Sequence, residues 1–165
     1  MAQGCSARAA AACTIGRAKP SDAEAMAACS TALADEIIAA QGESPLGSEH
    51  RASPQRAAAN LRSRGYRAFV ARSGDRVVGL ITMTEVREAV SEPDGWISEC
   101  YVEANWRAAG VGASLVHAAQ CEARWRGWWR IRVACPPLEA FVGTRRFYER
   151  EGFRALDERT LVLVL

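Results

Sequence analysis

Lysine is almost absent from this chain of 165 residues, because Lys19 is the single lysine among 21 basic side chains. No glycine pattern of the GxxxxGK(S/T) type precedes Lys19, which excludes the P-loop nucleotide site that depends on such a lysine. The formal net charge of +2 is too small to indicate a nucleic-acid or anionic-membrane partner by itself. The basic chemistry of the protein therefore comes from arginine.

Metal-ligand clusters, a disulfide framework and membrane segments are missing as well. The six cysteines show neither a CxxC pair nor the spacing of zinc ligands, so we expect no metal site and a reducing compartment. No apolar run approaches the roughly 18 residues that span a bilayer. Residues 1–12 are rich in small residues but lack the hydrophobic stretch of a secretory signal. We expect a cytoplasmic protein with no membrane partner.

Length and composition predict one globular domain of residues 13–165 behind a flexible tail of residues 1–12. A Ser21–Glu24 capping box and a Ser53-Pro54 pair predict two helix starts. The order of the expected elements implies an α/β (α+β) fold, a mixed sheet with helices on both faces. Strands are expected at 13–17, 66–71, 76–86, 96–103, 129–135 and 159–165, and helices at 21–40, 53–65, 110–126 and 138–151.

The most informative stretch is Arg107-Ala108-Ala109-Gly110-Val111-Gly112. It lies between a strand-like segment, 97–102, and a strong helix former, 113–119. A strand that turns through small residues into a helix leaves unpaired N–H groups at the helix start, and these groups favour phosphate. A plain strand-to-helix turn is the alternative interpretation.

Two further motifs give the chain a family resemblance. Phe147-Tyr148-Glu149-Arg150-Glu151-Gly152-Phe153 follows the phosphate motif, and Val77-Val78-Gly79-Leu80 precedes it. Together with RxxGxG at 107–112, they resemble the GNAT superfamily of acetyl-CoA-dependent N-acetyltransferases over roughly residues 66–155. The resemblance implies a mostly antiparallel sheet with a splayed central strand pair. Many members carry an asparagine at the position of Phe141, so the pantetheine contact there is expected to differ.

The resemblance implies acetyl-CoA as co-substrate, without a metal. Its pantetheine arm would pair with a strand edge, and its pyrophosphate would lie over the start of the following helix. A backbone N–H at the end of that strand, on Val102, would face the thioester oxygen. The implied binding residues are Cys100, Tyr101, Val102, Arg107, Ala108, Ala109, Gly110, Val111, Gly112 and Ala113.

Tyr148 is the candidate general acid for the CoA sulfur, with an amphipathic core tyrosine as the alternative. Glu99 is the candidate general base, with a solvated strand glutamate as the alternative. Strand alternation places Glu99 on the face of Tyr101 and opposite Cys100. A β-bulge, usual in the family, would re-aim the Glu99 side chain.

We expect transfer of an acetyl group to a primary amine. Acidic residues near the expected acceptor side would suit a small cationic molecule, although any solvated surface carries such acids: Asp35, Glu36, Glu43, Glu49, Glu88, Glu92 and Asp94. Glu36 and His50 are weak substrate-site candidates. The alternatives are a non-catalytic acyl-CoA-binding module and a protein N-acetyltransferase. A homodimer is common in the family. The segment 125–132, rich in tryptophan and arginine, favours a packing role over nucleic-acid binding.

Overall fold

The computed structural model describes residues 13–41, 52–87, 91–135 and 139–165. The strands are β1 (Thr14–Arg17), β2 (Tyr66–Ser73), β3 (Arg76–Val86), β4 (Asp94–Val102), β5 (Arg130–Ala134), β6 (Arg154–Ala155) and β7 (Thr160–Val164). The α-helices are α2 (Ala23–Gln41), α3 (Pro54–Leu61), α4 (Val111–Trp125) and α5 (Val142–Arg150), and the short 3₁₀ turns are η1 (Pro20–Asp22), η3 (Ala104–Trp106) and η4 (Glu139–Phe141).

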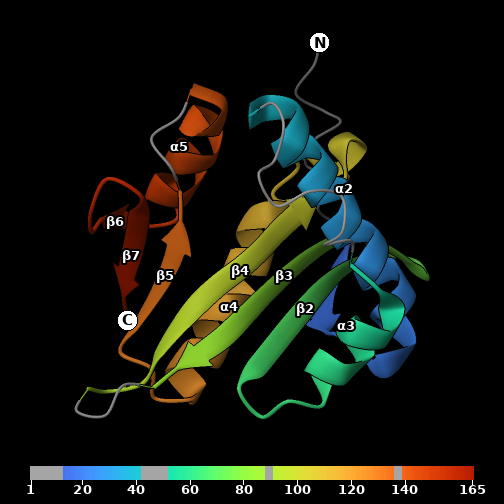
Figure 1. Ribbon diagram of the computed structural model, residues 1–165, viewed down its shortest axis with the longest axis horizontal. Helices are drawn as coiled ribbons and strands as arrows, with labels where there is room; N and C mark the ends of the chain where they lie inside the picture. The colour runs from blue at the N-terminus through green and yellow to red at the C-terminus, as the bar shows by residue number, and fades with distance from the viewer. Residues whose placement is uncertain (1–12, 42–51, 88–90, 136–138) are drawn as a thin grey trace.

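The seven strands form one sheet in the order β1-β2-β3-β4-β5-β7-β6. Every neighbouring pair is antiparallel except β4 and β5, which pair in parallel only where 95–97 face 131–133. Beyond Ile97 the two strands diverge, and α5 lies near their open end (Figure 1). Helices α2 and α3 cover one face of the sheet and α4 covers the other. The predicted mixed sheet and splayed strand pair are confirmed.

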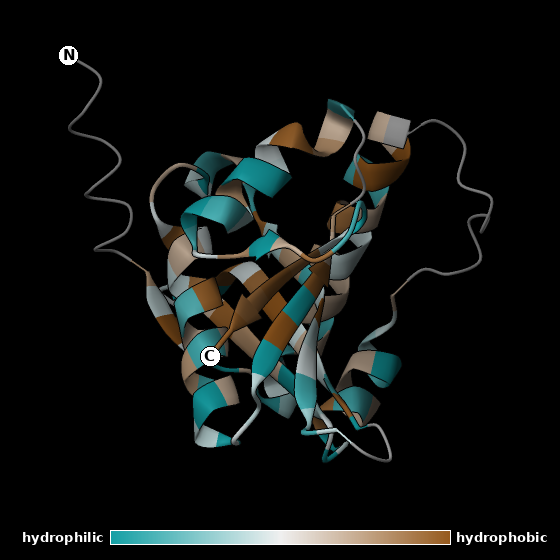
Figure 2. Ribbon diagram, turned by 90° about the vertical axis from the view of Figure 1, so that its left-hand side faces the viewer, coloured by the Kyte–Doolittle hydropathy of each residue, from teal (hydrophilic) through white to brown (hydrophobic). Residues whose placement is uncertain are grey.

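Two apolar clusters hold the helices to the sheet. One lies between the sheet, α4 and α5 and includes Leu115, Tyr148 and Phe153. The other lies under α2 and includes Met26 and Leu80. Hydrophobic and hydrophilic residues accordingly alternate along the helices in Figure 2. Strand β4 runs between the two clusters, so its successive side chains enter opposite layers of the molecule.

The local signals at the helix starts have different outcomes. Ser53 caps α3 as predicted, because its Oγ accepts a hydrogen bond from the Arg56 N–H at 3.2 Å. The predicted capping box at Ser21 is wrong. Proline begins the 3₁₀ turn η1 there, and Asp22 Oδ2 accepts from the Lys19 N–H at 2.6 Å instead. The two-residue strand β6 was not predicted, since so short a segment carries no periodic pattern.

Some features of the fold bear on what the protein can bind. Five described cysteines, Cys13, Cys29, Cys100, Cys121 and Cys135, are free thiols. Among the described residues no group of three or more potential ligands could hold a metal ion. Within the same part of the chain, none of the helices is both long and apolar enough to cross a bilayer.

Candidate active site

The helix start that follows β4 has the features of an anion site. Gly110 is the N-cap of α4 with a left-handed φ of 82°, and no side chain caps this end. The first backbone hydrogen bond of the helix runs from the Ser114 N–H to the Gly110 carbonyl at 3.0 Å. The N–H groups of Val111, Gly112 and Ala113 therefore have no acceptor within the helix. This donor set fits the pyrophosphate of acetyl-CoA.

The side chain of Arg107 ties this loop to α2. Its Nε donates to the Val102 carbonyl at 2.7 Å, and its Nη2 donates to Glu36 Oε1 at 2.6 Å. The guanidinium also lies over the Tyr101 ring, 5.6 Å from its centroid. Glu36 is therefore the ion-pair partner of Arg107 in the loop between β4 and α4. It does not line the pocket described below.

Beyond Ile97, the edge of β4 that faces β5 has backbone N–H and C=O groups that do not pair with the described residues of β5. The Glu103 N–H donates to the Val78 carbonyl of β3 at 3.0 Å. Along an antiparallel strand, the backbone N–H and C=O groups of successive residues point alternately toward and away from the neighbouring strand. The backbone groups of Tyr101 therefore face β3, while those of Cys100 and Val102 face away from it. No described residue of β5 pairs with β4 beyond Ile97. An extended ligand can hydrogen-bond to Cys100 and Val102 in that interval.

A β-bulge in β4 decides where Glu99 points. Thr82 of β3 faces Glu99, yet the next residue, Met83, faces Ile97, so Ser98 is the extra residue. Without the bulge, Glu99 would share the face of Ile97, which is buried in the cluster under α4. With the bulge, Glu99 lies on the opposite face, toward α2 and α3. The predicted irregularity in this strand is confirmed.

The carboxylate of Glu99 is held by a buried hydroxyl group. Thr82 Oγ1 donates to Glu99 Oε2 at 3.0 Å, and Thr82 is fully buried. The side chain of Tyr66 lies close to both residues. Burial, with the nearby negative charge of Glu99, raises the pKa of Tyr66 to about 12, although the Thr82 contact lowers it. Tyr66 therefore keeps its proton and remains a neutral neighbour of the carboxylate.

Glu99 lies in a pocket of about 250 Å³ between α2 and α3. The lining residues are Met26, Ala27, Ser30, Ala34, Ala52, Ser53, Arg56, Ala57, Asn60, Tyr66 and Glu99. His50, the other weak substrate candidate, lies outside the described residues. The pocket gives Glu99 an adjacent space that a small molecule can enter.

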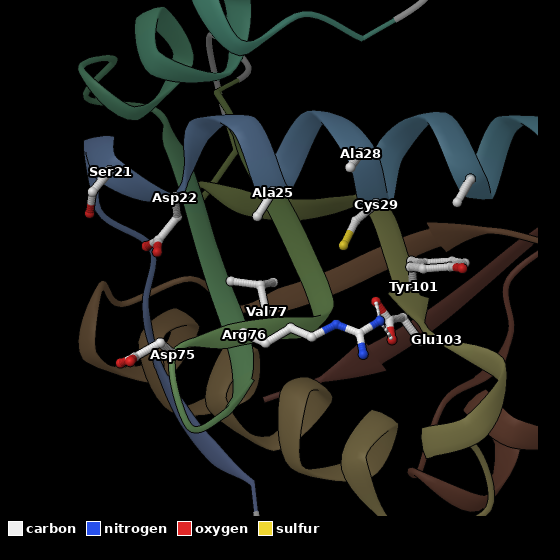
Figure 3. Close-up of a pocket in the computed structure, with 11 residues that line it drawn as sticks. Ser21, Asp22, Ala25, Ala28, Cys29, Asp75, Arg76, Val77, Tyr101 and Glu103 are labelled. Carbon is white, nitrogen blue, oxygen red and sulfur yellow. Dashed lines mark hydrogen bonds and ion pairs between the residues drawn. The ribbon is translucent and has the colours of Figure 1, made fainter.

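A second cavity of about 520 Å³ lies on another side of α2. Figure 3 shows Tyr101 and the Arg76–Glu103 ion pair, with an N–O distance of 2.7 Å, below the helix. Neither Glu99 nor Tyr148 lines this cavity. The larger cavity is therefore separate from the candidate catalytic groups.

Tyr148 is buried in the cluster between α4, α5 and the sheet, with 3% of its surface exposed. Its ring packs edge-on against Phe147 and Phe153, at centroid distances of 5.1 and 5.2 Å. Its side chain interacts with the side chain of Cys100 on β4. Burial, followed by the Cys100 side chain, raises the pKa of Tyr148 well above its usual value. The tyrosine therefore remains a proton donor throughout the physiological pH range.

Sequence reasoning missed Thr82 and Tyr66. Within 77–83 every residue except Thr82 is apolar or glycine, and the whole stretch is buried. A single hydroxyl in a fully buried strand needs a hydrogen-bond partner, which is the signal that could have identified Thr82. Tyr66 carried no comparable signal, because its contact with Thr82 depends on strand pairing.

Comparison with known proteins identifies the family to which this domain is similar. The sequence model of the acetyltransferase (GNAT) domain matches residues 64–155. No curated protein matches the chain. The chain resembles an aminoglycoside acetyltransferase from an uncultured soil metagenomic sample, solved with sisomicin, at 18% identity, 89% coverage of this chain, 91% of that chain and a TM-score of 0.69.

Two further solved structures share the architecture. The PaiA N-acetyltransferase from Thermoplasma acidophilum, solved with coenzyme A, is 13% identical, with coverage of 93% and 99% and a TM-score of 0.75. A ribosomal-protein-alanine N-acetyltransferase from Brucella melitensis biovar Abortus 2308 is 21% identical, with coverage of 84% and 89% and a TM-score of 0.65. At these identities the likeness shows the common fold.

Proposed function

Because the chain belongs to the GNAT acetyltransferase family, we propose that it transfers the acetyl group of acetyl-CoA to a primary amine of a small molecule. One observation carries the proposal. Strand β4 presents Glu99 to the pocket between α2 and α3, and the next residue, Cys100, meets the hydroxyl of Tyr148 on the opposite face. A candidate base and a candidate acid thus flank the strand edge that the donor substrate would occupy.

The donor substrate would be held at two places. The N–H groups at the start of α4, on Val111, Gly112 and Ala113, would bind the pyrophosphate. The outward backbone groups of Cys100, together with the Val102 carbonyl that also accepts from Arg107, would pair with the amides of the pantetheine arm, as an added strand does. The Val102 N–H would remain available to the thioester oxygen. Acetyl-CoA supplies the activated acyl carbon, and the remaining chemistry belongs to the side chains of this protein.

The proposed reaction is a direct transfer. Glu99 accepts a proton from the acceptor ammonium, directly or through water, and the neutral amine nitrogen attacks the thioester carbon. The C–N bond forms, the C–S bond breaks, and Tyr148 donates its proton to the departing sulfur. The attacking nitrogen loses its second proton through water, and a proton taken up from water restores the Tyr148 phenol. The Val102 N–H would stabilise the oxyanion, a contribution on the order of 3 kcal/mol. Products are the amide and free CoA thiol.

The charge of Glu99 supports a cationic group at the reacting end of the acceptor, since its carboxylate attracts the protonated amine. Two other acids from the predicted acceptor side have arginine partners elsewhere. Glu36 pairs with Arg107, and Asp94 is buried against Arg130 and Arg132. Attraction of the amine therefore rests chiefly on Glu99 among the described residues of the pocket.

A thiol-release assay tests the proposal. The protein is incubated with acetyl-CoA and a panel of small primary amines, with mass spectrometry of the products. We expect amine-dependent release of CoA thiol and a matching N-acetyl product. Tight CoA binding without thiol release for any amine would instead favour a binding module. Turnover restricted to peptide amines would favour a protein N-acetyltransferase.

A further inference from the structure

The pocket between α2 and α3 contains two side chains of opposite charge. Glu99 comes from β4, and Arg56 comes from the first turns of α3. The other lining side chains are uncharged, and the polar ones among them are Ser30, Ser53, Asn60 and Tyr66. An acceptor that binds at Glu99 therefore also lies near the positive charge of Arg56, an exposed residue of the pocket lining.

Neither charge is neutralised by a protein partner within the described ranges. The ion pairs of that part of the chain include neither Arg56 nor Glu99. Each residue has one hydrogen bond that holds it in place, through the backbone N–H of Arg56 and through the carboxylate of Glu99. The Arg56 N–H donates to Ser53 Oγ at 3.2 Å, and Glu99 Oε2 accepts from Thr82 at 3.0 Å. The pocket thus offers a cationic and an anionic group that do not satisfy each other.

A polycationic acceptor matches this arrangement poorly. Its first ammonium would meet Glu99, but the described lining supplies no second carboxylate for another ammonium. A further positive charge would instead approach Arg56, and like charges in an interface are unfavourable. An acceptor with one ammonium and one anionic group would pair both side chains.

We infer that the pocket takes a compact amine that also carries an anionic group, with the amine at Glu99 and the anion at Arg56. This inference rests on the proposed acetyl transfer and names the class of its acceptor. Planar guanidinium donors match a carboxylate well, since two N–H groups can bond to its two oxygens. The volume of about 250 Å³ lies below the usual 300–1,000 Å³ of sites for drug-sized ligands, which favours a molecule of amino-acid size.

Matched pairs of acceptors test this inference. Each pair differs by a carboxylate alone: ornithine against putrescine, β-alanine against ethylamine, and phenylalanine against phenethylamine. We expect kcat/KM to be at least about tenfold higher for the carboxylated member of the preferred pair. Arg56→Gln should remove that preference by lowering kcat/KM for the carboxylated member. The KM for acetyl-CoA should not change.

Arg62→Gln is the matched control, because Arg62 is an exposed arginine at the end of the same helix and does not line the pocket. The Arg62→Gln variant should prefer the carboxylated acceptor by the same kcat/KM ratio as the wild-type protein. Equal or better turnover of the decarboxylated amines, insensitive to Arg56→Gln, would overturn the inference and leave acetyl transfer intact. Absence of thiol release with every amine would instead contradict the proposed function.

A binding measurement keeps the inference testable without turnover. Calorimetric titration of the CoA-loaded protein with each matched pair should give tighter binding of the carboxylated member. Arg56→Gln should abolish that difference and Arg62→Gln should preserve it. Tighter binding of the decarboxylated amine than of its carboxylated partner by the wild-type protein would overturn the inference.

Discussion

The side chains of Tyr148, from α5, and Cys100, from β4, interact with each other in the interior of the protein. Burial raises the pKa of the Cys100 thiol to about 11, although the Tyr148 contact lowers it. The thiol is therefore protonated at neutral pH and poorly suited as a nucleophile. The buried phenol, in contrast, keeps its proton beside a sulfur atom, and the proposed general acid needs that proton.

Replacement of Tyr148 by phenylalanine should lower kcat by about 10²-fold, because it removes the proton donor and keeps the ring packing. The KM for acetyl-CoA should change little. Steady-state thiol release, with a melting curve to confirm folding, measures both effects. Wild-type kcat should show no basic limb below about pH 10, because the raised pKa keeps the donor protonated. An unchanged kcat in the variant would remove Tyr148 from the mechanism.

Glu99→Gln should abolish most of the turnover, because an amide cannot accept the proton of the acceptor ammonium. Thr82→Val should lower kcat about tenfold, because the carboxylate loses the hydroxyl group that orients it in the pocket. Thr84→Val is the control, since Thr84 is an exposed threonine of the same strand that contacts Ser98 instead. A Thr82→Val kcat equal to that of the control, measured by steady-state thiol release, would contradict the positioning role of Thr82.

Gly110→Ala should raise the KM for acetyl-CoA about tenfold, because a side chain at a left-handed N-cap disturbs the donors of the first turn. The strain of that backbone should also cost about 1–2 kcal/mol in the free energy of unfolding. Gly127→Ala provides the comparison, since Gly127 follows α4 with a φ of 70° and has open space around it. It should lose similar stability with an unchanged KM. Equal KM values in both variants would count against the pyrophosphate site.

Gly95→Ala should destabilise the fold by about 1–3 kcal/mol, because the added Cβ would lie 2.4 Å from two ring carbons of Trp128. Trp128 is buried and donates to Glu85 at 3.1 Å, so its ring has little freedom to move. Gly143→Ala, in the first turns of α5 with nothing within 4 Å, should gain up to about 1 kcal/mol. Thermal or urea unfolding measures both. A Gly95→Ala protein as stable as the wild type would show that the β4–Trp128 contact is loose.

The sequence predicted the features that arise from neighbouring residues. The strand-to-helix turn at 107–112, the cap at Ser53 and the order of strands and helices all follow from local patterns. A bulge that re-aims Glu99 was expected in this strand, but only the strand register places it at Ser98 and shows that Glu99 faces α2 and α3. The Thr82–Glu99 bond joins residues 17 apart, and the Arg107–Glu36 pair joins residues 71 apart. Contacts between residues so far apart in the chain cannot be predicted from the local pattern of apolar and polar residues.

The sequence by itself determined the proposed donor site of this protein, because a phosphate site at a helix start is built from consecutive backbone groups. Only the tertiary structure decided the proposed acceptor pocket. Glu99, Thr82 and Arg56 come from three separate elements, and their charges and hydroxyls meet only after the sheet has formed and α2 and α3 have packed onto it. The donor site is local geometry, whereas the acceptor pocket is a product of long-range packing.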